Sequence, residues 1–356
     1  MVADLSDIVR VLVPAFTSFV AGMLLTPVVA HYLYAFKAWK KSPGKIALNG
    51  EPAQEFNTLH TAHETRAPRM GGIVIWASVL LTILGIALVA RFVPDAAVLK
   101  FDFLSRSQTW IPLATLLVGA VVGFFDDVFT IRPKGVGVPL LYRLLVVVLL
   151  SSFIGTWFWA KLDVVAVGIP FGTPLEIGWL IVPLFVLISL ALYASGVIDG
   201  IDGLSGGVFG SVFASYAIIA FAQNQLDLAA FCAAIVGGIL AFLWYNIPPA
   251  RFYMSETGTM ALTLTIATVA FMTDELGGGV GIAVLPVIGA LLVLTVSSII
   301  VQTLSKKLLG RKVFRIAPLH HHFEALGWPA YKVVMRYWVL SVVFAFLGVI
   351  IALASV

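Results

Sequence analysis

The chain has 356 residues, of which 60% are hydrophobic and only 11% are charged, and its formal net charge is +4. A soluble domain carries roughly 25% charged residues, so this composition excludes an ordinary globular protein in water. The mean hydropathy of +1.04 favours a polytopic membrane protein instead. The single cysteine, Cys232, lies in an apolar run; it cannot form an intramolecular disulfide, and we expect it to pack in the core.

Long apolar runs recur along the whole chain. A bilayer core requires roughly 20 apolar residues per helix, so these runs predict about ten transmembrane helices in one all-α membrane domain over residues 1–356. A β-barrel would need alternating apolar and polar residues, whereas these runs are apolar all round. The predicted spans are 11–36, 71–93, 110–125, 138–160, 178–196, 204–222, 228–245, 258–273, 279–304 and 337–355.

Basic residues are distributed unevenly between the loops that join these spans. The odd-numbered loops carry sixteen lysines and arginines, and the even-numbered loops carry four. Because basic loops stay in the cytoplasm, this bias predicts cytoplasmic odd loops and external termini. The two largest polar stretches, 37–69 and 305–336, are then cytoplasmic. Attraction to anionic lipid or to an anionic substrate is a second interpretation of the basic surplus.

Acidic residues recur at the cytoplasmic ends of the predicted spans. "GFFDDVF" places Asp126 and Asp127 at the end of the third span, "GVIDGIDGLSGG" places Asp199 and Asp202 after the fifth, and Glu256 precedes the eighth. A lone acid at such a boundary is often only solvated, but adjacent acids raise one another's pKa unless a cation lies between them. Glycines flanking Asp199 and Asp202 disfavour a continuous helix there. Five carboxylates among basic loops indicate a Mg²⁺ and phosphate site on the cytoplasmic face.

Three consecutive histidines stand in "PLHHHFEALGWP", at His320, His321 and His322. A purification tag would be terminal and longer. Adjacent side chains point in different directions, which makes a zinc site from these three alone poor geometry. Structural packing in a loop is one alternative. The other, which we favour, is a polar site beside the carboxylates, where a histidine donates hydrogen bonds to phosphate or orients a loop.

Several motifs together resemble one enzyme family, the phospho-N-acetylmuramoyl-pentapeptide transferases (MraY). They are "PRMGGI", "FFDDV", "DGIDGL", "YNIPPARFYMSETG" and "PLHHHFEALGWP", the last flanked by "GRKVFRI" and "KVVMRYW", in the family's order over almost the whole chain. The "HHHFE" loop distinguishes this branch from related polyprenyl-phosphate N-acetylhexosamine-1-phosphate transferases. The resemblance implies Mg²⁺-dependent transfer of phospho-MurNAc-pentapeptide from UDP to undecaprenyl phosphate, giving lipid I and UMP for peptidoglycan synthesis.

The resemblance also implies partners and residue roles. The partners are UDP-MurNAc-pentapeptide, undecaprenyl phosphate and membrane lipid of the bacterial cytoplasmic (inner) membrane, with no nucleic acid; apolar helix faces are compatible with a homodimer. Catalytic roles fall on Asp126, Asp127, Asp199, Glu256, His320 and His321; substrate binding on Asp202, Asn246, Tyr253, Gln302, His322, Arg66 and Arg69; and Mg²⁺ coordination on Glu256, Asp127 and Asp199.

The chain departs from the family pattern at three places on the donor side. Glu256 in "YMSETGT" stands where the family has the aspartate of "F-M-G-D-x-G-S". Glu64 replaces the lysine of "K-x-G-T-P-T-M-G-G", although arginines lie nearby and can supply the charge from another backbone position. Tyr193 and Gly196 stand where the family has asparagines before D-G-x-D-G. These changes leave the nucleotide-sugar contacts open.

Three other functions remain open at this point. A transferase of the same superfamily could use another UDP-N-acetylhexosamine. A transporter or Mg²⁺ channel would place acids within the spans near the bilayer midplane rather than at one boundary. An inactive homologue would keep the motifs without Mg²⁺-dependent release of UMP.

Overall fold

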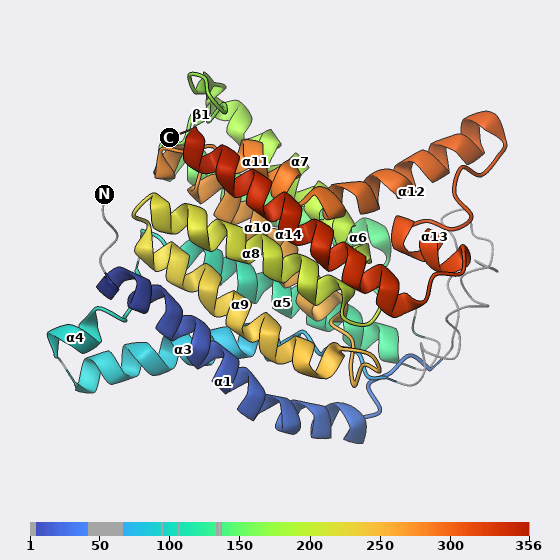
Figure 1. Cartoon of the computed structure of the whole chain (residues 1–356), viewed down its shortest axis with the longest axis horizontal. Coiled ribbons are helices and arrows are strands. Elements are labelled where there is room, and N and C mark those ends of the chain that lie inside the picture. Colours follow the sequence, from blue (N-terminus) through green and yellow to red (C-terminus); the bar gives the residue numbers. More distant parts are fainter. Residues whose placement is uncertain are drawn as a thin grey trace.

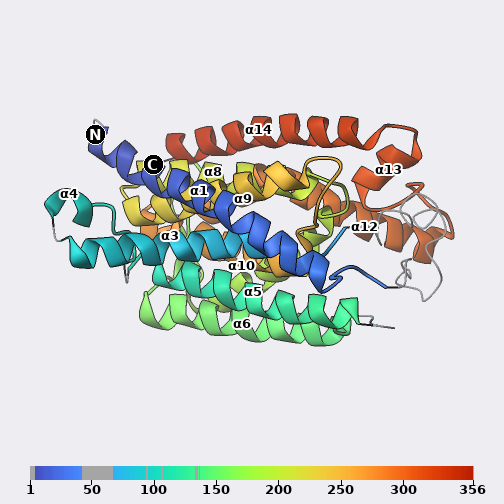
Figure 2. The same cartoon turned by 90° about the horizontal axis from the view of Figure 1, so that it is seen from below.

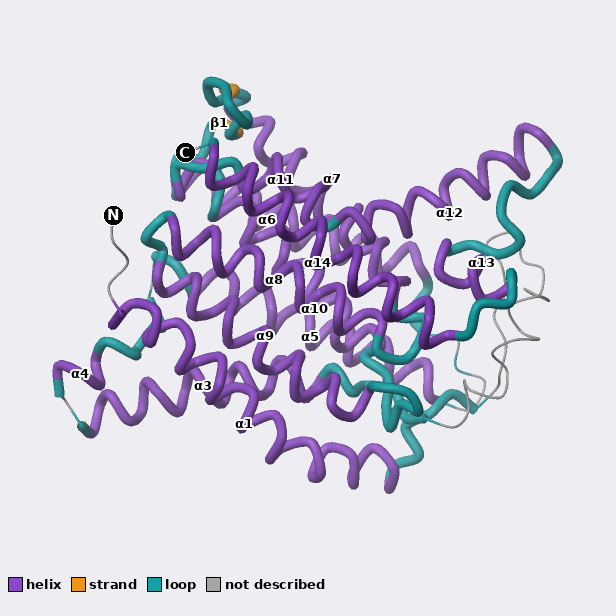
Figure 3. The backbone as a smooth tube through the Cα atoms, in the orientation of Figure 1, coloured by secondary structure: helices purple, strands orange, loops and turns teal. Residues whose placement is uncertain are grey.

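The computed structural model describes residues 5–41, 67–93, 95–105, 107–132, 135 and 137–355. Helices dominate this part of the chain, and the strands described there are one antiparallel pair of two residues each (Figures 1 and 3). In chain order the elements are α1 (Leu5–Ala35), α3 (Ile73–Phe92), α4 (Ala96–Leu99), α5 (Trp110–Ile131), α6 (Leu140–Lys161), β1 (Ala166–Val167), β2 (Leu175–Glu176), η1 (Gly178–Leu180), α7 (Ile181–Ser195), η2 (Gly196–Ile198), α8 (Leu204–Ala222), α9 (Leu226–Asn246), α10 (Ser255–Met272), η3 (Glu275–Gly277), α11 (Gly281–Ile288), α12 (Ala290–Leu309), α13 (Leu319–Ala325) and α14 (Ala330–Ala354). This confirms the all-α prediction.

The long helices form one bundle. Helix α9 packs against α1, α3 and α8; α14 packs against α8; α5 packs against α10; and α6 packs against α7. The start of α1 and the end of α14 lie at one end of the bundle, and α13 lies at the opposite end (Figures 1 and 2). The polar site described below is at the end that carries α13.

Among the described residues, nine helices are long and apolar enough to cross a membrane. They correspond to nine of the ten predicted spans, and helix α10 is the exception. Its five threonines lower its hydropathy, and nearly all of its side chains are buried within the protein. Buried threonines such as Thr263 and Thr265 satisfy their hydroxyls by donating to the carbonyl oxygen four residues earlier. Helix α10 is therefore the enclosed centre of the bundle.

The predicted span 279–304 is two helices rather than one. Helix α11 carries Pro286, and Gly289 separates it from α12. Proline removes a backbone donor and glycine weakens a helix interior, so a break within this run is physically reasonable. After the break α12 diverges from the bundle (Figure 1). The prediction of one continuous helix was wrong here.

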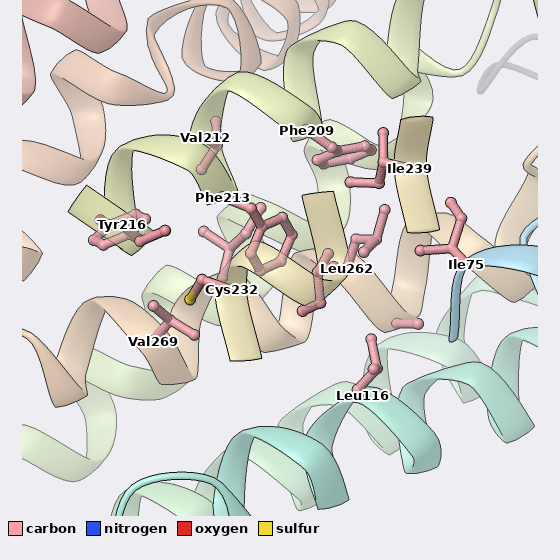
Figure 4. Close-up of a cluster of buried hydrophobic side chains, with 14 of the residues drawn as sticks. Ile75, Leu116, Phe209, Val212, Phe213, Tyr216, Cys232, Ile239, Leu262 and Val269 are labelled. Atoms are coloured by element: carbon pink, nitrogen blue, oxygen red, sulfur yellow. The ribbon is translucent and has the colours of Figure 1, made fainter. Parts of the chain in front are cut away.

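The centre of the bundle is a close-packed apolar core (Figure 4). Phe209, Phe213 and Cys232 are each 0% exposed, which confirms the packing role predicted for the cysteine. Tyr216 is also fully buried, and its hydroxyl donates a hydrogen bond to the carbonyl oxygen of Gly281 at 2.9 Å. A buried tyrosine needs such a partner because its hydroxyl has left water.

Candidate active site

Asp127 begins the site by capping helix α10. Its buried Oδ2 accepts hydrogen bonds from the Ser255 hydroxyl (2.6 Å), the Thr257 amide (2.9 Å) and the Thr257 hydroxyl (2.7 Å). The first amides of a helix have no partner within it, and a carboxylate is a strong acceptor for them. Gly123 allows this contact, since a Cβ there would lie 2.1 Å from the carbonyl oxygen of Glu256. The glycine one turn before Asp127 thus lets α5 touch α10.

Arg69 occupies the other oxygen of the same carboxylate. Its Nε donates to Oδ1 of Asp127 at 2.9 Å. Burial opposes the charge of Arg69, but the acids Asp127, Glu256 and Asp199 together outweigh this effect and raise the pKa of the guanidinium. Three of these four donors share Oδ2, whereas Oδ1 accepts only from Arg69 among the described residues. In this arrangement Asp127 organises the site, and only its Oδ1 has a lone pair left for a further contact.

The adjacent Asp126 has different partners. It is 4% exposed, and its Oδ1 accepts from the amide of Val138 at 2.7 Å. Arg143, from α6, reaches between α5 and α10: its Nη1 lies 2.9 Å from Oε1 of Glu256 and 3.6 Å from Oδ2 of Asp126. Tyr193, from α7, lies against this guanidinium. One arginine therefore joins four helices at the site.

Asp199 and Asp202 lie between helices, as the flanking glycines predicted. Asp199 follows η2; its two oxygens accept from the Ser205 hydroxyl (2.7 Å) and the Ser255 amide (2.8 Å). Burial raises the pKa of Asp199, and these hydrogen bonds oppose that rise. Asp202 instead accepts from the amide of Ala250 at 3.0 Å. Asp199 thus connects the loop to the start of α10, while Asp202 holds the loop at 247–253.

Asn246 is a buried clamp between loops. It is 1% exposed; its Oδ1 accepts from the Gly203 amide at 2.9 Å, and its Nδ2 donates to the Phe252 carbonyl at 2.8 Å. Tyr253 is partly buried, and its amide donates to the carbonyl of Pro68 at 2.9 Å. The loop at 67–72 is thereby held against the loop at 247–253.

The first two histidines lie against the aspartate loop. His320 and His321 are buried on α13, with ring centroids 4.3 Å apart, and Nδ1 of His321 lies 2.7 Å from Oε2 of Glu324. A Cβ on Gly200 would lie 2.7 Å from Nε2 of both rings. The glycine after Asp199 therefore permits the histidine helix to dock directly on the D-G-x-D-G loop.

His322 and Gln302 support the neighbouring wall. Nδ1 of His322 accepts from the Arg315 amide at 3.1 Å, and burial, followed by the charge of Arg315, lowers the pKa of this histidine. The side-chain amide of Gln302 accepts from the Val313 and Phe314 amides at 3.1 and 2.9 Å, and donates to the Phe314 carbonyl at 2.8 Å. Both side chains fasten the segment after α12. Two further positions, Arg66 and Glu64, lie outside the described residues.

In this arrangement the carboxylates predicted to coordinate Mg²⁺ are engaged by donors of the protein itself, so an ion binds there only after these contacts rearrange. Within the part of the chain that the structure describes, no three histidine, cysteine, aspartate or glutamate residues are placed to hold a metal. Asp127 already accepts four hydrogen bonds, Asp199 bonds to two neutral donors, and Glu256 faces the guanidinium of Arg143. Two of the predicted metal ligands are instead paired with arginines: Asp127 with Arg69, and Glu256 with Arg143.

Three contributors to the site went unrecognised in the sequence. Arg143 lies near the start of an apolar run, and an arginine in such a run is a functional signal. Ser255 and Met70 adopt φ angles of +52° and +69°, and the Met70 amide donates to the Ser255 hydroxyl at 2.8 Å. Such left-handed residues are uncommon and gather at functional sites. Ser255 stands at the glycine of "F-M-G-D-x-G-S", which was a readable signal.

The fold and its polar cluster define an α-helical, multi-pass membrane protein whose candidate active site lies at one end of the bundle. Residues 109–274 match the family described as Glycosyl transferase family 4. The phospho-N-acetylmuramoyl-pentapeptide-transferase of Geobacillus sp. (strain WCH70) is 32% identical over 340 residues, which cover 94% of this chain and 95% of that protein. The protein of that name from Shouchella clausii (strain KSM-K16) is 32% identical over 341 residues, with the same coverage of both chains.

A third relative, the phospho-N-acetylmuramoyl-pentapeptide-transferase of Bacillus thuringiensis (strain Al Hakam), is 30% identical over 348 residues, covering 96% of this chain and 97% of that protein. The chain belongs to the phospho-N-acetylmuramoyl-pentapeptide-transferase family. The family inferred from the motifs is thereby confirmed.

Proposed function

We propose that this chain transfers phospho-MurNAc-pentapeptide from UDP-MurNAc-pentapeptide to undecaprenyl phosphate, giving lipid I and UMP. The observation that carries the proposal is similarity over at least 94% of the chain to three transferases of that name. The acids and histidines matched to the family motifs also form one connected cluster, from the contacts of Asp127 and Asp199 with Ser255 to the histidine rings beside Gly200. We further propose the bacterial cytoplasmic membrane as the location, with the site on the cytoplasmic face.

The reaction requires two anions to meet. An oxygen of the acceptor phosphate forms a bond to the phosphorus that carries the sugar, and the bond from that phosphorus to the bridging oxygen breaks, so UMP leaves with the bridging oxygen. Catalysis of such a transfer rests on positioning and charge neutralisation. Arg69 and Arg143 are the described cations within the cluster, with side chains 27% and 24% exposed. A guanidinium presents a planar fork of donors that suits phosphate oxygens.

The remaining residues act by holding this geometry. Asp127 fixes Arg69 and the start of α10 together. Asn246 and Asp202 brace the loops beside them, and His320 and His321 are docked on Gly200. We propose contact with the donor for the partly exposed Tyr253. Participation of His320 and His321 in catalysis stays a proposal, as does a homodimer.

Dependence on Mg²⁺ also stays a prediction. Mg²⁺ is commonly held by one or two carboxylates, several waters and substrate phosphates, so a bound diphosphate is expected to complete its ligands. Glu256 is the candidate carboxylate, since its side chain is 25% exposed.

The donor is the detail that most needs a test, because Tyr193 and Glu256, two departures from the family pattern, lie beside Arg143. Purified protein in detergent is given undecaprenyl phosphate and either UDP-MurNAc-pentapeptide or UDP-GlcNAc, with and without Mg²⁺. We expect a lipid product and UMP only from the first donor and only with Mg²⁺. Product from UDP-GlcNAc alone would instead support the related polyprenyl-phosphate transferases.

A further inference from the structure

Arg143 lies on the carboxylate that is otherwise best placed for a divalent ion. Its Nη1 is 2.9 Å from Oε1 of Glu256 and 3.6 Å from Oδ2 of Asp126. The three side chains are 24%, 25% and 6% exposed, so water screens this cluster only in part. The guanidinium therefore neutralises Glu256 from within the protein.

A metal ion and this guanidinium need the same space. Mg²⁺ binds carboxylate oxygens at about 2.0–2.1 Å, so an ion on Glu256 would lie close to Nη1 of Arg143. Like charges at that separation repel strongly in a partly buried site. We infer that Arg143 and a divalent cation compete for the Glu256 carboxylate, so that this arginine must be displaced before the ion binds there. The inference rests on the proposed function only in its choice of a divalent cation.

The contacts also distinguish Arg143 from Arg69. The partner of Arg69, Asp127, additionally holds Ser255 and Thr257, so this pair is built into the start of α10. The Nε of Arg143, in contrast, is buried with no hydrogen-bond partner in the described structure. The guanidinium of Arg143 therefore has an N–H group without an acceptor. If the guanidinium moved onto the oxygens of a bound diphosphate, more of its N–H groups would be hydrogen-bonded. Arg143 is thus the cation suited to exchange.

The test measures binding of Mn²⁺ alone, without donor or acceptor. The full chain in detergent is titrated with Mn²⁺, and the free ion is followed by electron paramagnetic resonance. Arg143→Gln keeps much of the side chain and removes the charge; we expect it to bind Mn²⁺ about tenfold more tightly than the wild type. Arg143→Lys keeps a positive charge, so its affinity for Mn²⁺ should increase less than that of Arg143→Gln. Arg10→Gln is the matched control, since Arg10 pairs with Asp227 of α9 outside the cluster.

Glu256→Gln shows whether the increase in Mn²⁺ affinity depends on the Glu256 carboxylate. In the double variant Arg143→Gln/Glu256→Gln we expect the tightening to disappear. An Arg143→Gln protein that binds Mn²⁺ no more tightly than the wild type would overturn the inference. So would a gain that persists without the Glu256 carboxylate, or an equal gain in Arg10→Gln. This titration contains no sugar nucleotide, so its result does not depend on which donor the enzyme uses. The Mn²⁺ affinities can therefore be interpreted even if the donor assay fails.

Discussion

Nη1 of Arg143 and Oε1 of Glu256 lie 2.9 Å apart and join α6 to the first turn of α10. Tyr193 lies beside the same guanidinium. The residues at 193 and 256 are two of the positions where the chain departs from the family motifs, and they share Arg143 as a neighbour. The departures therefore form one connected cluster in space.

The Glu256 carboxylate is expected to be essential, while the length of its stem matters less. Glu256→Asp keeps the charge and should retain Mg²⁺-dependent turnover within about tenfold. Glu256→Gln should lose about 10²-fold or more, because we propose that Glu256 holds Mg²⁺ and a bound ion supplies several kcal/mol of charge stabilisation. Release of UMP at saturating donor measures both. Equal turnover in the wild type and Glu256→Gln would remove this residue from the ligand set.

Asp127 is expected to be the main stability determinant of the site. Asp127→Asn turns one acceptor oxygen into a donor group facing existing donors and leaves Arg69 without its charge partner. Breaking a buried pair in this way costs about 3–5 kcal/mol. Thermal unfolding in detergent should therefore show a large fall in Tm. The control is Asp163→Asn, an exposed residue at φ +53° that asparagine tolerates, with no more than a small expected change.

Ser255 combines backbone strain with a useful hydroxyl. Ser255→Ala keeps the φ of +52° and removes the hydrogen bond to Asp127, so it should destabilise by about 1–2 kcal/mol. Ser255→Gly loses the same hydroxyl but relieves the left-handed strain, worth about 1 kcal/mol. We expect glycine to unfold at a higher temperature than alanine in matched melts. The reverse order would show that strain at this position is negligible.

Gly200 is expected to control how α13 docks. Alanine there would place a methyl group 2.7 Å from Nε2 of His320 and His321, so the two rings or the helix that carries them must shift. A displacement near 1 Å at reacting groups can cost about 10²-fold in rate, so Gly200→Ala should reduce turnover strongly. Gly85→Ala, where a Cβ meets nothing within 4 Å, is the control and should leave turnover unchanged. Similar turnover in both variants would separate α13 from catalysis.

Asp274, at the opposite end of α10 from the site, gives a pH-dependent stability. Its two oxygens accept from the amides of Gly168 and Ile282 at 2.7 and 2.8 Å, and burial nevertheless raises its pKa from 3.8 to about 6. Since the folded form holds its proton more tightly, this residue's contribution is greatest below about pH 4 and is lost as pH rises through 6. At about 1.4 kcal/mol per pKa unit, the change is about 3 kcal/mol.

The comparison variant is Asp274→Asn, which cannot titrate. Its Tm should be compared with that of the wild type from pH 4 to 7. From pH 4 to about 6 the Tm of the wild type should fall relative to that of the variant. Above about pH 6 the difference between the two Tm values should stay constant. A constant difference between the two curves would exclude the assigned pKa.

Hydrophobicity was enough to predict most of the helices, and the motifs singled out side chains that the structure brings together. The apolar runs require helices because lipid offers no hydrogen-bond partner to a backbone. The enclosure of α10 was missed, although the five threonines that lower its hydropathy were a readable signal. The break at Gly289 was also missed, because glycine is tolerated inside many helices.

Side-chain pairing was the part that the sequence could not supply. Asp126 and Asp127 are adjacent, yet they bond to Val138 and to α10 respectively, because neighbouring residues on a helix point about 100° apart. Arg143 and Glu256 are 113 positions apart in the sequence, so no local sequence pattern could predict their contact. The motifs singled out the charged residues that cluster, and the tertiary packing decided which group neutralises which.

The central claim is tested most directly by the lipid product formed from undecaprenyl phosphate with each donor in turn. We expect Mg²⁺-dependent formation of lipid I and an equal amount of UMP from UDP-MurNAc-pentapeptide, and no lipid product from UDP-GlcNAc. Lipid product from UDP-GlcNAc alone, or no release of UMP from either donor, would contradict the assignment of this chain as a phospho-MurNAc-pentapeptide transferase.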